Sequence, residues 1–334
     1  MEKQAVTIYT VAREARVSMA TVSRVVNGNP NVKPATRQKV LDVIKQLNYR
    51  PNAVARGLAS KRTTTVGVVI PDITNPYSAE LALGIDDIAT MYKYNIILAN
   101  SDYDSEKTLK VVRNLLAKQV DGVIFMGNNM TEEIKEEFKN ANTPVVVAGS
   151  IVDDKEFPAV RIDYRKAAKE AVDKLIDHNK DHVALVSGPL KYTINGDEKL
   201  GGYKDALAAK NVKYDEDLVV ETDGLYDSAY QLGKDLVAKG IKAAYVTNDH
   251  LAVGLMNGLT DNGIKVPDDF EIIASNDTKY TRLARPMLSS ITQPLYDLGA
   301  VAMRLLTKRM EDQDEPESDV ILDHGFVDRQ STRG

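Results

Sequence analysis

The sequence contains no cysteine, which excludes disulfides, thiolate metal sites and cysteine nucleophiles. Long apolar runs are also absent, since no stretch approaches the ~18 residues that a membrane-spanning helix needs. The first ten residues, MEKQAVTIYT, lack the apolar core of a signal peptide. We therefore expect a cytoplasmic protein that does not associate with membranes.

Recognisable catalytic motifs are missing as well. There is no phosphate-binding glycine loop, dinucleotide-binding fingerprint or GxSxG motif. Among the four histidines, His178 and His182 are four residues apart, but the intervening residues 179–181 are typical of a helix end. We expect neither an enzyme nor a metal or cofactor site.

Basic residues are concentrated at the start of the chain. Residues 1–62 hold 12 Lys and Arg against 3 Asp and Glu, a balance of +9, whereas the rest holds 31 against 45, a balance of −14. A basic head on an acidic body is typical of a nucleic-acid-binding module joined to a domain that does not bind nucleic acid. Any contact with DNA should therefore be confined to the head.

Two short helices with a tight turn between them are expected in this head. Residues 7–15 place apolar side chains at helical spacing after Thr7, a helix-capping residue type, and residues 19–27 do the same after Ser18. The free face of the second helix carries small polar groups and Arg24. Such a helix suits the DNA major groove, where arginine can form two hydrogen bonds to guanine. An ordinary helical hairpin is the alternative.

Two further segments complete the head. A third helix is expected at about residues 35–47, where it closes a small three-helix core. Residues 52–60 have weak helical periodicity and are too short to be stable alone. In a dimer, two such segments would bring a pair of Leu58 side chains to the minor groove as wedges. A plain interdomain linker is the alternative.

From about residue 63, short β-rich runs alternate with helical segments. This pattern indicates parallel sheets covered by helices on both faces. About ten strands fit two doubly wound subdomains better than one, with a ligand cleft at the carboxyl ends of the strands.

Three motifs resemble the LacI/GalR family of bacterial transcription regulators, and the resemblance covers essentially the whole chain. They are TVSRVVNG at 21–28, NYRPNAVARGLAS at 48–60 and TTTVGVVIPDITNPY at 63–77. The resemblance implies an all-α helix-turn-helix head, a hinge helix and a periplasmic-binding-protein-like α/β body, in a homodimer on pseudo-palindromic double-stranded operator DNA. The expected divisions are a head at 1–50, a hinge helix at 51–62, a core N-subdomain at 63–162 and 293–320, and a core C-subdomain at 163–292 and 321–334.

The resemblance also implies which side chains contact the operator. We expect base contacts from Met19, Ala20 and Arg24, phosphate contacts from Thr7, Tyr9, Thr21, Ser23 and Asn31, further contacts from Ser18 and Asn27, and hinge contacts from Asn52, Ala55 and Leu58. One departure from the family is Thr10, which stands where an acidic residue usually completes the capping box of the first helix. Threonine fills this position poorly, so we expect a less stable first helix.

In the body, the resemblance implies effector-cleft contacts from Lys199, Asn248, Asp249, Asn276 and Asp277. Sugar-responsive relatives usually have an arginine where this chain has Lys199, and lysine suits a phosphate as a point charge. The strand end at 274–277 lacks the aromatic residue on which relatives stack a ligand. We expect at most weak binding of a sugar phosphate such as glucose 6-phosphate or fructose 1,6-bisphosphate.

The helix at 296–308, YDLGAVAMRLLTK, resembles the co-repressor-binding helix of the family members that control carbon catabolism. Their co-repressor is HPr, the phosphocarrier of sugar uptake, phosphorylated on a serine. Arg304 and Lys308 share one helix face and present two cations to a phosphoserine. The expected contacts are Asp72, Asp87, Tyr296, Asp297, Val301, Arg304 and Lys308. Without the resemblance, the alternative is the solvated face of a packed helix.

The predicted function is the regulation of carbon catabolite repression or activation. Serine-phosphorylated HPr would dock across the two subdomains, bring the hinge helices together and strengthen operator binding, to the extent that it prefers the closed state. One alternative is a local repressor controlled by a small sugar. The other is a sugar-binding receptor without a DNA role, against which the basic head argues.

Overall fold

The computed structural model describes residues 6–50, 62–127, 130–152, 154, 156–180, 182–311 and 319–333. The chain divides into two compact units, Met1–Thr63 and Thr64–Gly334, each described here by itself. The candidate hinge helix and its predicted DNA contacts Asn52, Ala55 and Leu58 lie outside the described residues.

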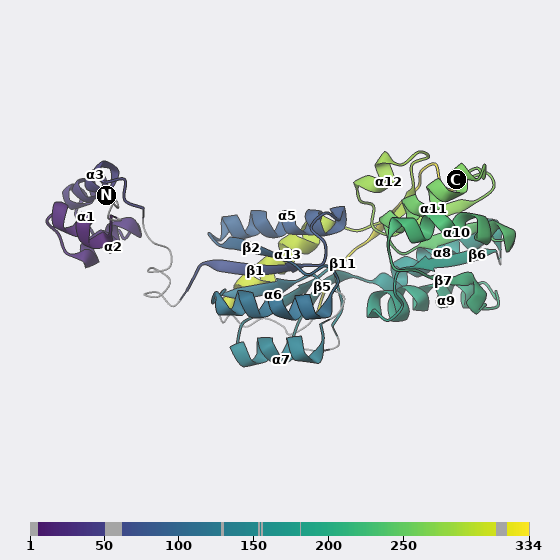
Figure 1. The fold of residues 1–334 in the computed structure, drawn as a ribbon, viewed down its shortest axis with the longest axis horizontal. Coiled ribbons are helices and arrows are strands. Elements are labelled where there is room, and N and C mark those ends of the chain that lie inside the picture. The colour runs from purple at the N-terminus through teal and green to yellow at the C-terminus, as the bar shows by residue number, and fades with distance from the viewer. Residues whose placement is uncertain are drawn as a thin grey trace. The chain divides into compact units, whose positions relative to one another are not determined.

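The first unit contains the three predicted head helices (Figure 1): α1 (Ile8–Glu14), α2 (Met19–Val26) and α3 (Pro34–Gln46). Their buried core consists of Val11, Ala12, Ala15, Val22, Val25, Val32 and Val40. Ser18 caps α2, since its Oγ accepts the Thr21 N–H at 3.2 Å. At α1, Thr7 and Thr10 form a reciprocal capping box despite the missing acidic residue. Its hydrogen bond from the Thr7 N–H to Thr10 Oγ1 is long, at 3.4 Å.

The second unit begins with an all-parallel six-stranded sheet of strand order β11-β5-β4-β3-β1-β2. Its strands are β1 (Thr65–Ile70), β2 (Asn95–Asn100), β3 (Gly122–Phe125), β4 (Val145–Ala148), β5 (Ala159–Ile162) and β11 (Val320–Leu322). One face packs on α5 (Pro76–Met91) and α13 (Leu295–Met310), and the other on α6 (Ser105–Ala117) and α7 (Glu132–Ala141).

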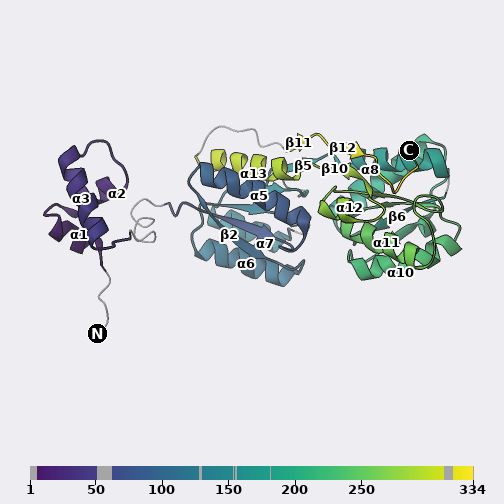
Figure 2. The same ribbon diagram turned by 90° about the horizontal axis from the view of Figure 1, so that it is seen from above.

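The second sheet has the order β12-β10-β9-β8-β6-β7 and is parallel except for β12. Its strands are β6 (Val183–Ser187), β7 (Val219–Glu221), β8 (Ala243–Val246), β9 (Glu271–Ala274), β10 (Ser289–Thr292) and β12 (Gly325–Val327). One face packs on α8 (Tyr164–Asn179), the π-helix η1 (Ile194–Lys199) and α9 (Leu200–Ala209), and the other on α10 (Tyr226–Ala238) and α11 (Asp249–Asp261). The short η2 (Glu216–Leu218) and α12 (Lys279–Leu283) complete this subdomain, whose helices flank the sheet in Figure 2.

The fold class of two doubly wound subdomains is thereby confirmed, and the chain passes between the sheets three times. The first two passages follow β5 and β10, next to the predicted positions Asp163 and Gln293. The third was expected near Val320 but lies between Leu322 and Gly325. The reason is that Val320–Leu322 still pairs with β5, so residues 321 and 322 belong to the first sheet and not to the second subdomain.

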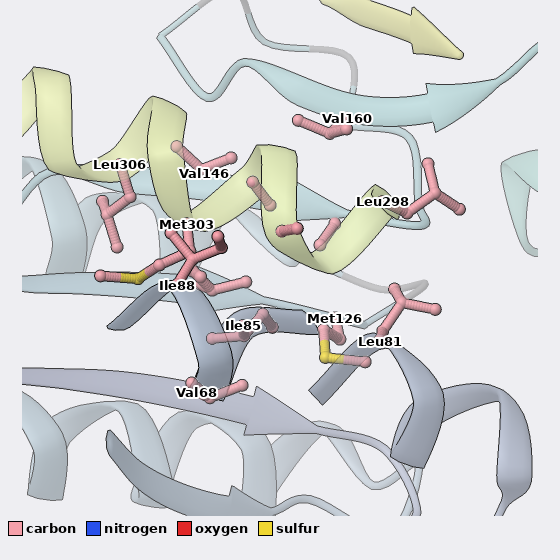
Figure 3. Packing of buried hydrophobic residues seen from close by; sticks show 14 of the residues in the cluster. Val68, Leu81, Ile85, Ile88, Met126, Val146, Val160, Leu298, Met303 and Leu306 are labelled. Atoms are coloured by element: carbon pink, nitrogen blue, oxygen red, sulfur yellow. The ribbon is translucent and has the colours of Figure 1, made fainter. Parts of the chain in front are cut away.

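Helices α5 and α13 pack with their backbones almost in contact. A Cβ on Gly84 would lie 2.0 Å from the Tyr296 carbonyl oxygen, and a Cβ on Gly299 would lie 2.0 Å from that of Leu81. Leu81, Ile85, Leu298 and Met303 fill the space beneath (Figure 3). Glycine is therefore required where the two helices cross. No helix in the described part of the chain is long and apolar enough to cross a membrane.

Candidate functional site

The predicted DNA contacts of the head lie at its surface. Val22 and Val25 are buried, which turns the opposite face of α2 outward. Met19 is 41% exposed and Ala20 and Arg24 are exposed. Thr7, Tyr9, Ser18, Asn27 and Asn31 are exposed, and Thr21 and Ser23 are partly exposed. All ten predicted contacts within the described head are thus accessible to a DNA duplex.

One head residue that the sequence did not single out holds the loop after α2. The Arg37 guanidinium donates from Nη2 to the Asn29 carbonyl, and the Asn29 side chain accepts the Asn31 N–H at 2.9 Å. Arg37 therefore orients the segment that carries Asn31. Its role depends on a hydrogen bond across eight residues, which no local sequence pattern reveals.

A cavity of about 400 Å³ lies between the two subdomains. Its lining residues follow the carboxyl ends of strands in both sheets, for example Asp72 after β1 and Asn248 after β8, as expected for doubly wound sheets. Of the five predicted cleft residues, Lys199, Asn248 and Asn276 line this cavity.

Lys199 already has partners within the protein. Its side chain lies at the end of η1, is 5% exposed, and donates from Nζ to the Thr247 carbonyl at 2.6 Å. The ammonium also lies 5.9 Å from the centroid of the Tyr164 ring, within the range of a cation–π interaction. Burial lowers the pKa of Lys199 to about 8. A ligand anion would have to compete with these partners.

Asp249 and Asp277 do not line the cavity, which corrects the expectation for both residues. Asp249 is buried and accepts the N–H groups of Asn276 at 3.1 Å and Thr278 at 2.7 Å; its burial raises its pKa. Asp277 forms an ion pair with Arg329 at 2.7 Å. Both carboxylates therefore hold the loop after β9 in place.

The aromatic residues of the cleft are not among the five residues that were predicted to line it. The cavity lining includes Tyr77, Tyr103, Tyr164, Tyr192 and His250. These residues lie far apart in the sequence and in both subdomains, so only the fold brings them together.

Most of the predicted partner contacts gather on α13 and the adjoining face of α5. Tyr296 is 42% exposed, Asp297, Arg304 and Lys308 are exposed, and Val301 is partly buried. The Tyr296 hydroxyl donates to Asp87 Oδ2 at 2.9 Å, which joins the two helices at this surface. We call these six residues (Asp87, Tyr296, Asp297, Val301, Arg304 and Lys308) the α5–α13 surface.

Asp72 has a different position. It lies in the loop after β1, lines the cleft, and accepts the N–H and hydroxyl of Thr74 at 2.8 and 2.7 Å. All seven predicted partner contacts belong to the first subdomain. Of the two ways in which a partner could act, contact with both subdomains or with one mobile element, these residues fit the second better.

A helix-turn-helix head and a body of two doubly wound, largely parallel sheets define the class of DNA-binding regulators with a periplasmic-binding-protein-like body. The comparisons agree. Residues 7–52 match the family described as bacterial regulatory proteins, lacI family, and residues 172–332 match the periplasmic binding protein-like domain.

Relatives similar over the whole chain define the family further. Catabolite control protein A of Streptococcus mutans is 57% identical over 98% of each chain, and that of Priestia megaterium is 54% identical over 98% of this chain and 99% of the relative. The structure of transcription regulator CcpA of Lactococcus lactis has a TM-score of 0.78 at 48% identity, covering 81% of this chain and 100% of that one. The lac repressor dimer bound to operator has a TM-score of 0.88 at 26% identity, covering 99% and 100%.

The chain therefore belongs to the lacI family of bacterial transcription regulators. It is a DNA-binding regulator of transcription of the catabolite-control type, and its close relatives are regulators and not enzymes. The predicted function is confirmed at this level.

Proposed function

We propose that this regulator binds pseudo-palindromic double-stranded operator DNA as a cytoplasmic homodimer, with serine-phosphorylated HPr as its co-repressor. The observation that carries the co-repressor assignment is the α5–α13 surface, where Arg304 and Lys308 are exposed beside the Tyr296–Asp87 hydrogen bond. The lac repressor structure, which is a dimer on its operator, supports the mode of DNA binding.

The charges of the α5–α13 surface suit a phosphoprotein. Arg304 and Lys308 are four residues apart on α13 and are both exposed, so they offer charge-assisted hydrogen bonds to one phosphate. Asp87 and Asp297 are exposed nearby, so basic side chains next to the phosphate would be attracted as well. A free sugar phosphate has no such basic groups.

The head performs the readout of the operator. Met19, Ala20 and Arg24 contact bases, Thr7, Tyr9, Thr21, Ser23 and Asn31 contact phosphates, Ser18 and Asn27 add further contacts, and Asn52, Ala55 and Leu58 act from the hinge helix at 51–62. The partner strengthens this binding by acting on the first subdomain, because all seven proposed contacts belong to it. To do so it must bind the DNA-competent arrangement more tightly than the other.

The cleft is a weaker switch. Lys199 and Asn248 line it, but the Lys199 ammonium is occupied by Thr247, and the carboxylates of Asp72, Asp102 and Asp223 also line the cavity. A sugar phosphate such as glucose 6-phosphate or fructose 1,6-bisphosphate would lose hydrating water on binding, and these carboxylates would repel its phosphate. We therefore propose that such ligands bind weakly.

Operator binding measured by fluorescence anisotropy tests the proposal. The titration is run with no addition, with HPr, with serine-phosphorylated HPr and with a panel of sugars and sugar phosphates. We expect only the phosphorylated HPr to tighten binding strongly, and Arg304→Ala to abolish that gain while leaving the free protein's affinity unchanged. Arg113→Ala, on α6 of the same subdomain, is the matched control and should keep the gain. If HPr has no effect and one sugar alone shifts the curve, the protein is a local sugar-responsive repressor.

A further inference from the structure

Two tyrosines from different subdomains meet at the cavity between them. Tyr77 lies in the first turn of α5 and packs against the core of the first subdomain, and Tyr164 begins α8 and is buried in the core of the second. Their hydroxyl oxygens are 3.4 Å apart. Because the Tyr77 hydroxyl donates to the Gly149 carbonyl at 3.0 Å, its oxygen is left to accept the hydroxyl of Tyr164. The two form a hydrogen-bonded chain that ends on the first subdomain's backbone.

The backbone is shaped to admit this chain. Gly149, directly after β4, has φ of +64°, a region that favours glycine. A Cβ at this position would lie 2.5 Å from the Tyr77 hydroxyl and 2.9 Å from Leu81 Cδ2. Only glycine therefore leaves room for the Tyr77 hydroxyl at the end of β4.

The second subdomain supports Tyr164 from the other side. Tyr164 is 2% exposed, and the Lys199 ammonium lies over its ring while donating to the Thr247 carbonyl. Burial raises the pKa of Tyr77 to about 12 and that of Tyr164 well above its ordinary value. Both hydroxyls therefore remain protonated and can donate at every physiological pH.

The start of α5 lies at the cavity between the subdomains, which Asn75 and Tyr77 line together with Asn276 of the second subdomain. Glu80, one turn after Tyr77, is partly buried, and this burial raises its pKa, while Arg282 of α12 opposes the shift. The same helix carries Asp87 and crosses α13 at Gly84. One rigid helix thus joins the inter-subdomain contact to the α5–α13 surface.

We infer that the Tyr77–Tyr164 contact is a latch that favours the closed arrangement of the two subdomains of the body. The hydroxyl contact joins the two subdomains directly, and the Lys199 ammonium supports Tyr164 from within the second subdomain. The latch positions α5 in the free protein and sets the population of closed molecules on which any partner acts. The inference goes beyond the proposed function and does not depend on what the partner is.

The absence of cysteine allows a direct measurement of subdomain closure in the full chain. Lys118→Cys in the first subdomain and Lys239→Cys in the second, both at exposed positions after α6 and α10, accept a pair of spin labels. Double electron–electron resonance then reports the distance between the subdomains. Mixing the labelled protein with an excess of unlabelled chain restricts the signal to labels within one chain.

Three variants carry the test: Tyr164→Phe, Tyr77→Phe and the double variant. Phenylalanine keeps the ring and removes only the hydroxyl. Since one buried hydrogen bond typically changes an equilibrium about fivefold, we expect Tyr164→Phe to raise the ratio of open to closed molecules about fivefold. The double variant should show no larger shift than Tyr77→Phe, because both substitutions remove the same contact. Tyr77→Phe also leaves the Gly149 carbonyl without its donor, which makes Tyr164→Phe the cleaner of the two.

The matched control is Tyr245→Phe. The Tyr245 hydroxyl is equally buried and lies 3.0 Å from Ser275 Oγ, but both residues belong to the second subdomain. Its loss should lower the melting temperature without changing the distance distribution. A distribution that is unchanged in both latch variants, or shifted to the same extent in Tyr245→Phe, would overturn the latch. If one latch variant does not fold, as judged by circular dichroism, the other decides the question.

Discussion

At the scale of single residues, several charged groups predicted to bind a ligand form hydrogen bonds with the protein's own backbone. Asp249 was expected in the cleft and instead accepts two backbone N–H groups that shape the loop after β9. Lys199 lines the cleft, but its ammonium donates a hydrogen bond to the Thr247 carbonyl. Buried polar groups need internal partners because an unsatisfied one costs about 1–3 kcal/mol.

The buried Lys199 makes the stability of the body depend on pH. Its pKa is lowered from 10.5 to about 8 by burial, so between these values the unfolded chain binds more protons than the folded one, and stability rises with pH. We expect the free energy of unfolding to rise by about 1.5 kcal/mol more between about pH 8 and 9.5 in the unsubstituted protein than in Lys199→Met. Urea denaturation at both pH values measures this difference. Parallel pH profiles for the two proteins would show that the amine is not buried in this way.

At the scale of elements, the pair α5 and α13 links the chain's functional surfaces. Both helices cover the same face of the first sheet (Figure 3). Gly84 and Gly299 let their backbones approach closely, so the position of Asp87 on α5 is set by Tyr296 on α13. The α5–α13 surface is therefore a property of the packing of two helices and not of one helix alone.

Substituting Gly84 tests this packing. In Gly84→Ala, the new Cβ would lie 2.0 Å from the Tyr296 carbonyl oxygen, so the helices must separate. We expect a loss of about 2–3 kcal/mol of stability, typical of overpacking, together with a weaker response to phosphorylated HPr. Chemical denaturation and operator titration measure the two effects.

Gly201→Ala in α9 is the matched control for this helix substitution. The three atoms nearest to its Cβ would be guanidinium atoms of Arg165, at 3.0–3.4 Å. They form the far end of a flexible side chain whose ion pair with Asp205 is at the surface. Because alanine is the better helix former, this variant should keep or gain stability by up to about 1 kcal/mol. Equal losses in both variants would mean that the close crossing of α5 and α13 carries no special constraint.

At the scale of the whole molecule, charge is divided between the two units. The head has a net charge of +9 and the body a net charge of −14. The attraction to DNA phosphates therefore comes from the head. Counterion release should make operator binding steeply dependent on salt, and the acidic body should contribute little to that dependence.

A salt titration of operator binding separates the two units. We expect the affinity to fall roughly 10³-fold between about 50 and 200 mM salt, as for proteins with six or more phosphate contacts. Lys33→Gln, at an exposed head position before α3, removes one positive charge of the head and should reduce the slope of log K against log salt concentration by up to about one. Lys118→Gln in the body should leave the slope unchanged. A slope that Lys118→Gln reduces as much as Lys33→Gln does would place part of the DNA contact outside the head.

The head and the class of body could be predicted from the sequence because their signals are local. Helical spacing places Val22 and Val25 on one face of α2 and leaves Arg24 on the other, whatever the rest of the chain does. The strands of the body also have a local signal. They are short apolar runs, because a strand that is buried on both faces requires apolar side chains throughout. The third passage between the sheets was misplaced by a few residues because β11 and β12 are separated by only two residues.

The elements, the basic head and the family of this protein could be predicted from the sequence, because each depends on neighbours along the chain. Which distant residues meet depends instead on the packing of the whole fold. Tyr77 and Tyr164 are 87 residues apart and Asp87 and Tyr296 are 209 apart, yet each pair is in contact. The physical reason is that side-chain hydrogen bonds depend on positions within a few tenths of an ångström, and these positions follow from how the two sheets and the α5–α13 pair pack.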